Sequence, residues 1–221
     1  MNDARQTVME AEAVAIRYGA TPVVSDVNLT IMDGAQLVMT GRSGSGKTSL
    51  LLAFACLIAP SSGRVSWPGL DVRPKVRRAQ IGMVFQAPSL MPELSALQNV
   101  MLPLRMAGSG EQSAVEAAGA ALCDLGVEDL SDALPTQLSG GQQQRIAVAR
   151  VLAGRHRLVL ADEPTGALDR DSAHHVVQCL RRGVAAAGGA LVLATHDQEL
   201  ADTFEDTMSV EAGRLAAGAL R

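Results

Sequence analysis

The chain has 221 residues, of which 48% are hydrophobic and 19% are charged, so it can bury the core of one large domain. Its formal net charge is −4, and its aromatic residues are one Trp, one Tyr and three Phe. Because surfaces that bind nucleic acid need positive charge and rings that stack on bases, these counts argue against nucleic acid as a partner. No apolar run approaches the roughly 18 residues that span a bilayer, and the polar N-terminus lacks the apolar core of a signal peptide. We therefore expect a cytosolic chain that does not cross a membrane by itself.

The first part of the chain is rich in predicted strands. Residues 23–32 (VVSDVNLTIM) and 37–40 (LVMT) have the composition of strands and are joined by a turn at Asp33-Gly34. We expect this N-terminal part to be antiparallel β structure. The apolar run over 47–59 is too long for a strand and begins directly after glycines, which predicts a largely buried helix.

Three short apolar runs, at 81–85, 158–161 and 190–194, are bounded by turn or charged residues, as strands buried on both faces are. A helix expected at about 172–187 joins the last two of these strands. This alternation of strand, helix and strand favours a mainly parallel sheet covered by helices. The segments TMSV and GRLA after residue 206 predict a short strand pair that closes the fold.

The stretch 88–155 is rich in predicted helix, including the alanine-rich segment 111–125. We expect one domain over 1–221, with an α/β core at about 1–87 and 156–221 and an inserted helical subdomain at about 88–155. The predicted fold class is therefore α/β, with a mainly parallel sheet, an N-terminal antiparallel β part and an inserted α-helical subdomain.

The segment GRSGSGKT (41–48) matches the pattern G-x-x-x-x-G-K-[ST] in full, between a predicted strand and a predicted helix. Glycines let backbone N–H groups turn inward around phosphate oxygens, and the helix N-terminus adds partial positive charge. Lys47 is expected to contact the β- and γ-phosphates, and the Thr48 hydroxyl to bind Mg²⁺. The predicted nucleotide-binding residues of this P-loop NTPase core are Gly41, Arg42, Ser43, Gly44, Ser45, Gly46, Lys47, Thr48 and Ser49.

Two acidic residues, Asp162 and Glu163, directly follow the apolar strand LVLA. At the carboxyl end of a parallel strand, both side chains can reach the crevice where ligands bind in such sheets. We expect Asp162 to hold Mg²⁺ through water and Glu163 to polarise the attacking water as the general base. Taken alone, the pair is more typical of an acidic turn that ends a strand; the phosphate loop makes the functional interpretation the stronger one.

A second candidate anion site lies at Leu138-Ser139-Gly140-Gly141-Gln142, which opens another predicted helix. Ser139 suits the N-cap, and the two glycines expose the N–H groups of the first turn. One ATP needs only one such anion-binding site within a subunit. A second site therefore suggests that each subunit uses it to bind the ATP of a neighbouring subunit. An ordinary capped helix is the alternative for this segment taken alone.

The segments LSGGQQQR (138–145) and LADEP (160–164), with the phosphate loop before them, resemble the ATP-binding subunits of ABC transporters. The order and spacing match along residues 8–216. The resemblance implies the ABC ATPase fold, hydrolysis of ATP with Mg²⁺, and two copies of the chain that close around two MgATP to drive an integral-membrane permease. It also implies a place at the cytoplasmic face of the inner membrane, held there through the permease.

The same resemblance assigns roles to residues outside the phosphate loop. Tyr18 would stack on adenine, Gln86 would bind Mg²⁺ and sense the partner, and His196 would reach the γ-phosphate. The catalytic residues would be Glu163, His196 and Lys47, and the metal ligands would be Thr48, Gln86 and Asp162. The residues expected at the interface between the two copies are Ser139, Gly140, Gly141, Gln142 and Asp169.

Within the family, DEPTGALD (162–169) and MPELSALQNVMLPL (91–104) look most like the bacterial group that serves macrolide export, lipoprotein release and haem export. The alternatives are an importer ATPase and the cell-division ATPase of this group, which moves no substrate and relays a conformational change. The methionine-bearing segment 87–106 is expected either to face the permease's coupling helix or to fill the core.

Three other classes fit the sequence less well. DNA-repair ATPases of the SMC type share the signature but split it with a long coiled coil, and this sequence has no sustained heptads. A two-cassette translation factor would need a second copy of every motif. A nucleotide-binding module without catalysis is disfavoured because Glu163 and His196 are both present.

Overall fold

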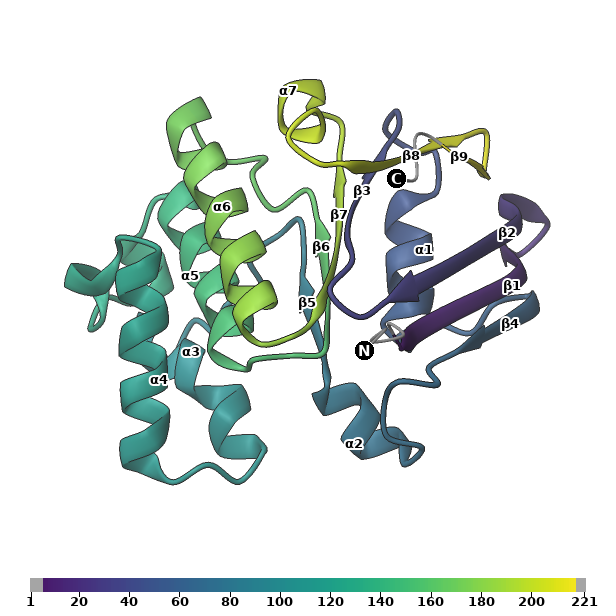
Figure 1. Cartoon of the computed structure of the whole chain (residues 1–221). Helices are drawn as coiled ribbons and strands as arrows, with labels where there is room; N and C mark the ends of the chain where they lie inside the picture. The colour runs from purple at the N-terminus through teal and green to yellow at the C-terminus, as the bar shows by residue number, and fades with distance from the viewer. Residues whose placement is uncertain (1–5, 218–221) are drawn as a thin grey trace, which may run out of the picture.

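The computed structural model describes residues 6–217, which form two β-sheets and the helices around them (Figure 1). The larger sheet has the strand order β5 (Ile81–Val84), β6 (Leu158–Asp162), β7 (Ala190–Thr195), β3 (Gln36–Thr40), β8 (Asp206–Glu211) and β9 (Arg214–Ala217). Its neighbouring strands are parallel from β5 to β8, and only β9 runs antiparallel to its neighbour. The smaller sheet is antiparallel, in the order β2 (Thr21–Met32), β1 (Thr7–Tyr18) and β4 (Ser62–Ser66).

The α-helices of the described chain connect and cover these strands. They are α1 (Lys47–Phe54), α2 (Pro74–Ala79), α3 (Ala96–Met106), α4 (Glu111–Asp124), α5 (Gly140–Ala153), α6 (Arg170–Ala186) and α7 (Gln198–Ala201), with short 3₁₀ turns at Glu128–Leu130 and Pro135–Gln137. Among residues 6–217, none of these helices combines the length and the apolar character needed to cross a bilayer.

The central strands β6 and β7 of the larger sheet are buried on both faces, which explains why their sequences are nearly continuous apolar runs. In β6, Val159 and Ala161 belong to the hydrophobic core formed with helices α3 to α6. The alternate residues Leu158 and Leu160 belong to a second core, formed with α1 and the smaller sheet. Figure 1 shows this arrangement, with α3 to α6 on one side of the strands and α1, β1 and β2 on the other. The prediction of a mainly parallel sheet between helices is therefore confirmed.

Two details of the predicted first half differ from the structure. The strands joined at Asp33-Gly34 do not pair with each other: β2 belongs to the smaller sheet, while β3 pairs with β7 and β8. The helix predicted over 47–59 ends at Phe54, and the chain then turns through Cys56, which has a φ of 59°. Burial continues past the helix end, since Ala55 is only 6% exposed, so the apolar run gave no sign of where the helix stops.

The helices between β5 and β6 share their core with α6 and the larger sheet. The division into an α/β core and a helical subdomain that begins at about residue 88 stays a prediction, because buried side chains continue from these helices to the strands. In Figure 1 the helices α3 and α4 lie farthest from the smaller sheet.

A buried asparagine fixes the connection between β5 and α3. Asn99 is 0% exposed; its Oδ1 accepts from the Met91 N–H at 2.7 Å, and its Nδ2 lies 2.9–3.1 Å from the carbonyls of Met91, Leu94 and Ser95. We expect Asn99→Ala to lower the free energy of unfolding by about 3 kcal/mol, because it leaves several buried polar groups unpaired. Urea denaturation measures this loss. The exposed neighbour Gln98, changed to Ala, should cost less than about 1 kcal/mol, and equal losses would contradict the prediction.

Candidate active site

The phosphate loop connects the end of β3 to the start of α1, and its backbone demands glycine at two positions. Gly41 has a φ of 149°, and a Cβ there would lie 2.5 Å from the carbonyl oxygen of Val210. Gly46, the N-cap of α1, has a φ of 109°, and a Cβ would lie 3.0 Å from the carbonyl oxygen of Val23. The loop thus packs tightly against its neighbours while the first N–H groups of α1 stay available to a ligand.

The side chain of Lys47 lies inside this loop. Its Nζ donates to the carbonyl oxygen of Gly41 at 2.6 Å and to that of Arg42 at 3.3 Å. The ammonium is also 3.8 Å from Oε1 of Glu163, and only 7% of the side chain is exposed. A buried positive charge is thus held where the loop meets the carboxyl end of β6. The hydroxyl of Ser45 is also buried and has no hydrogen-bond partner among the described residues. Both groups suit a phosphate ligand.

Thr48 and Asp162 form the second half of the site. The Thr48 hydroxyl donates to Oδ2 of Asp162 at 2.7 Å, whereas Oδ1 is buried without a hydrogen-bond partner among the described residues. Burial raises the pKa of Asp162, and the Thr48 hydrogen bond opposes that shift. An unpartnered carboxylate oxygen beside a hydroxyl is a donor set that fits Mg²⁺. Residues 6–217 contain no cluster of three or more His, Cys, Asp or Glu that could hold a metal by itself, so a Mg²⁺ ion here would also need oxygen ligands of other kinds, from an amide side chain, phosphate or water.

Glu163 stands at the sharp turn that ends β6. Its φ is 46°, and its backbone N–H continues the sheet by donating to the carbonyl of Ala194 at 2.9 Å. One carboxylate oxygen, Oε2, lies 2.9 Å from Nδ1 of His196, while Oε1 faces Lys47. The Glu163 side chain is 11% exposed, whereas the His196 side chain is 71% exposed. A nearly buried carboxylate with one group on each oxygen has the fixed orientation that a general base needs.

These groups line a cavity of about 150 Å³. Its walls are Val23, Ser43, Gly44, Ser45, Gly46, Lys47, Thr48, Ser49, Asp162 and Glu163. Tyr18 lies beside it, 53% exposed, with its hydroxyl 3.3 Å from the Oγ of Ser49. The phosphate loop and the end of β6, separated by more than a hundred residues of sequence, therefore line one cavity.

The second predicted anion site is a well-formed helix start that lies apart from this cavity. Ser139 caps α5: its Oγ accepts from the Gln142 N–H at 3.3 Å, and its own N–H donates to Oε1 of Gln142 at 2.8 Å. A Cβ on Gly141 would lie 3.0 Å from Leu168. Within the described chain, none of residues 139–142 lines the cavity at the phosphate loop.

Asp169 and Gln86 are also outside the cavity. Asp169 caps α6, accepting from the N–H and the hydroxyl of Ser172 at 2.9 Å each, and these hydrogen bonds lower the pKa of the carboxyl. Gln86 follows β5 and is exposed. Its side chain makes no hydrogen bond within residues 6–217.

Sequence reasoning missed the contacts between α5 and the loop after β5. Gln144 donates to the carbonyl of Phe85 at 3.4 Å, and Arg150 donates to those of Pro88 and Ser89 at 3.0 and 2.9 Å. The partners are backbone oxygens about sixty residues away in the sequence. Because every residue carries such an oxygen, the residue types gave no basis for predicting these contacts.

A family model described as ABC transporter matches residues 24–166, more than half of the chain. The chain belongs to the ABC transporter family. The lipoprotein-releasing system ATP-binding protein LolD of Nitrobacter hamburgensis is 41% identical over 205 residues, covering 86% of this chain and 88% of that protein. The macrolide export ATP-binding/permease protein MacB of Syntrophobacter fumaroxidans is 39% identical; the match covers 87% of this chain but only 28% of MacB.

Solved ABC cassettes have the same fold. The dimeric structure of the bacterial ABC transporter cassette MJ0796 superposes with a TM-score of 0.88 at 34% identity, covering 96% of this chain and 99% of that one. Its post-hydrolysis dimer, bound to ADP and Pi, gives a TM-score of 0.87. The predicted ABC ATPase fold is confirmed, and the chain is an ABC cassette that binds nucleotide and hydrolyses ATP.

Proposed function

We propose that this ABC ATPase powers an export-type membrane permease as a pair of copies that close around two MgATP. The observation that carries the proposal is the convergence of Lys47, Thr48, Asp162 and Glu163 on one cavity, with the helix start at Ser139 turned to a separate surface. Support for the export type comes from the similarity to LolD and MacB, whose names describe lipoprotein release and macrolide export.

In the proposed complex, ATP lies along the phosphate loop with its adenine on Tyr18. The backbone N–H groups of 43–49 and the Ser45 hydroxyl donate to the phosphates, and the Lys47 ammonium exchanges the loop carbonyls for β- and γ-phosphate oxygens. The exposed ring of Tyr18 lies next to α1, whose N-terminus receives the phosphates. Base and phosphates would thus be bound by neighbouring segments.

Thr48, Asp162 and Gln86 are the proposed residues of the Mg²⁺ site. The metal, when bound, neutralises negative charge that develops on the phosphate oxygens. Asp162 contributes its unpartnered oxygen, and Thr48 its hydroxyl. Gln86, on the exposed loop after β5, would join them when that loop approaches the nucleotide.

Glu163 is the proposed general base. In the described structure, Lys47 and His196 each occupy one of its oxygens. When the phosphates draw the Lys47 ammonium to themselves, Oε1 becomes free to accept a proton from the attacking water. His196 keeps its contact with Oε2 and, being largely exposed, can also reach the γ-phosphate.

The second copy is proposed to complete each site. The N–H groups at Gly140 and Gly141 and the side chains of Ser139 and Gln142 would meet the γ-phosphate bound to the other copy, with Asp169 at the same interface. In support, Ser139 and Gly140 are exposed, and in the described chain none of residues 139–142 lines the cavity of its own copy.

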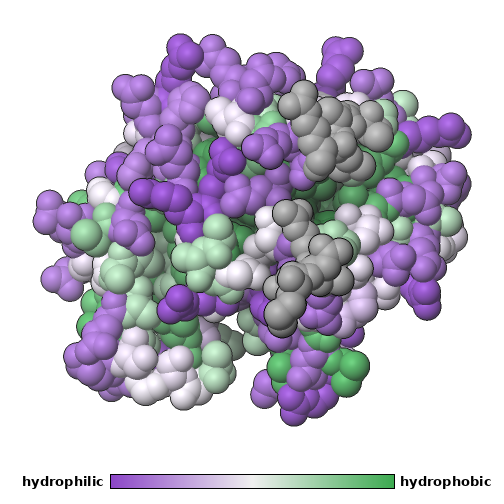
Figure 2. Space-filling view, in the orientation of Figure 1, coloured by the Kyte–Doolittle hydropathy of each residue, from purple (hydrophilic) through white to green (hydrophobic). Residues whose placement is uncertain are grey.

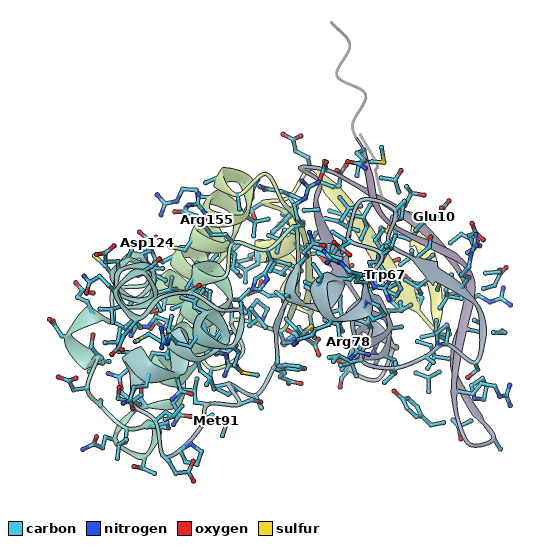
Figure 3. The ribbon with its side chains drawn as sticks, turned by 90° about the horizontal axis from the view of Figure 1, so that it is seen from below. Glu10, Trp67, Arg78, Met91, Asp124 and Arg155 are labelled. Carbon is cyan, nitrogen blue, oxygen red and sulfur yellow. The ribbon has the colours of Figure 1, made fainter. Side chains whose placement is uncertain are left out.

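The proposed docking site for the permease is a groove of about 470 Å³ between α2, α3 and α5. In Figure 2 the lower edge of the molecule is indented between the lobes that carry α3 and α2, and Figure 3 labels Arg78, which lines the groove on the α2 side. Within 87–106, Met106 is 78% exposed and lines the groove, and Met91 is 47% exposed, whereas Met101 packs against the core. These exposures support a partner-facing role for Met106 and Met91 and a core role for Met101. Through this groove the chain is proposed to be held at the cytoplasmic face of the membrane.

Affinity capture tests whether the partner is an export-type permease. Glu163→Gln should retain MgATP and stay in the closed pair, so it should co-purify a permease of few spans with a large extracytoplasmic domain from detergent-solubilised host membranes. The nucleotide-binding variant Lys47→Ala serves as the matched control and should capture far less. Capture of a permease with many spans by Glu163→Gln would favour an importer. Capture of a non-transporting membrane complex would favour the cell-division role, and either result would overturn the export proposal.

A further inference from the structure

The loop between β5 and α3 is held to the helices by side chains at three places. The carbonyl of Phe85 accepts from Gln144, and the carbonyls of Pro88 and Ser89 accept from the two terminal nitrogens of Arg150. Farther along, the buried Asn99 holds the segment 91–95. The two attachments nearest β5 both come from α5.

Gln86 lies between these two attachments. It and Ala87 are exposed, and the Gln86 side chain has no hydrogen bond of its own within residues 6–217. The place of Gln86 is therefore set by the backbone on either side of it. The attachment on the C-terminal side holds Ser89, which has a φ of 50°, a conformation that costs energy for a residue with a side chain. A strained loop with few contacts needs an outside group to keep its shape.

Arg150 has the chemistry to be that group. It forms no ion pair among the described residues; its guanidinium donates at 2.9 and 3.0 Å to two successive carbonyls. Burial lowers the pKa of the guanidinium, and no ion pair with a carboxylate within residues 6–217 offsets the desolvation of this charge. A planar fork can hold two adjacent carbonyls at once, which an ammonium on a flexible stem cannot do equally well. The two hydrogen bonds to the loop carbonyls therefore offset the free energy lost when the Arg150 guanidinium is removed from water.

We propose that Arg150 is a positioning residue for Gln86, because it fixes the loop after β5 to helix α5. Any movement of α5, which begins at Ser139 and Gly140, would then move Gln86 with it. The loop and the helix then move as one body relative to the phosphate loop. The effect on hydrolysis rests on the proposed role of Gln86 at the metal, whereas the attachment itself does not.

Backbone ¹⁵N relaxation without nucleotide tests the attachment directly. In Arg150→Met, the order parameters of the amides of 86, 87, 89 and 90 should fall from the rigid range of about 0.85 to below about 0.6, and those of Arg150→Lys should lie between. The matched control is Arg105→Met, because Arg105 also donates to a backbone carbonyl, that of Ser109 at 2.8 Å, and is not among the side chains that hold this loop. Amides of β6 report whether each variant is folded. Unchanged order parameters at these four residues in a folded Arg150→Met chain would overturn the proposal.

A double-mutant cycle tests whether Arg150 acts through Gln86. Arg150→Met and Gln86→Ala should each lower kcat about tenfold with the KM for ATP within about twofold of its original value, because neither residue lines the phosphate loop. The double variant should be no more than about twofold slower than Gln86→Ala. A loss of about a hundredfold, the product of the two, would mean that Arg150 acts independently and would overturn the proposal. If Gln86→Ala leaves kcat unchanged, the proposed role of Gln86 fails, and the relaxation measurement alone decides whether Arg150 holds the loop.

Discussion

Glu163→Gln is expected to lower ATP hydrolysis by at least about a hundredfold while leaving ATP binding intact. The glutamine has the same size and can adopt the same turn, and its amide can still meet His196. It cannot accept a proton from water, however, and it no longer carries the charge that faces Lys47. Chemistry should therefore stop after the nucleotide has bound.

The measurement combines phosphate release with the mass of the chain in solution. With MgATP, the variant should accumulate as a closed pair of copies; with MgADP it should not. Glu199→Gln is the matched control, because Glu199 pairs with Arg170 at the surface near His196 and lies outside the cavity. Hydrolysis by Glu163→Gln at the original rate would show that another group is the base.

Lys47→Ala is expected to weaken ATP binding by at least about a hundredfold. The substitution removes a buried positive charge from the phosphate loop and takes the ammonium away from the Glu163 carboxylate, which lies 3.8 Å from it. Phosphate groups would then enter a site whose net charge has become more negative. The loss should be greater for ATP than for ADP, because the γ-phosphate adds the charge that Lys47 is placed to meet.

Calorimetric titration with each nucleotide measures these affinities. The sequence supplies its own control, since Lys75 is the other of its two lysines and lies exposed on α2. Lys75→Ala should bind both nucleotides as the unchanged chain does. Equal losses in the two variants would mean that overall charge, and not the place of Lys47, governs binding.

The parts of this site that could be predicted are those that require particular residue types at fixed positions in the sequence. The phosphate loop and the Asp162-Glu163 pair were found because their chemistry requires specific residue types at fixed local spacing. The parallel strands were found because burial on both faces produces continuous apolar runs. The pairing of Glu163 with His196 at 2.9 Å joins residues on neighbouring strands, and only the family resemblance pointed to His196.

Other features left no local signal. The helix over 47–59 was predicted too long because an apolar residue is equally suited to a buried helix and to the buried turn that follows it. The strands on either side of Asp33-Gly34 satisfied the pattern of a hairpin, yet the turn carries the chain from the smaller sheet to the larger one, where β3 pairs with β7 and β8. Arg150 left no signal in the sequence, because its partners are backbone oxygens.

The strand order of the larger sheet also decides when the site can exist during synthesis. β3, which ends in the phosphate loop, is hydrogen-bonded to β7 and β8, and these strands are made about 150 residues after it. A ribosome-bound chain that has passed Glu163 but not yet reached Ala190 carries every residue that lines the phosphate cavity, while β3 still has neither neighbour. We therefore expect nucleotide to stabilise the fold only after β7 and β8 have paired with β3, late in synthesis.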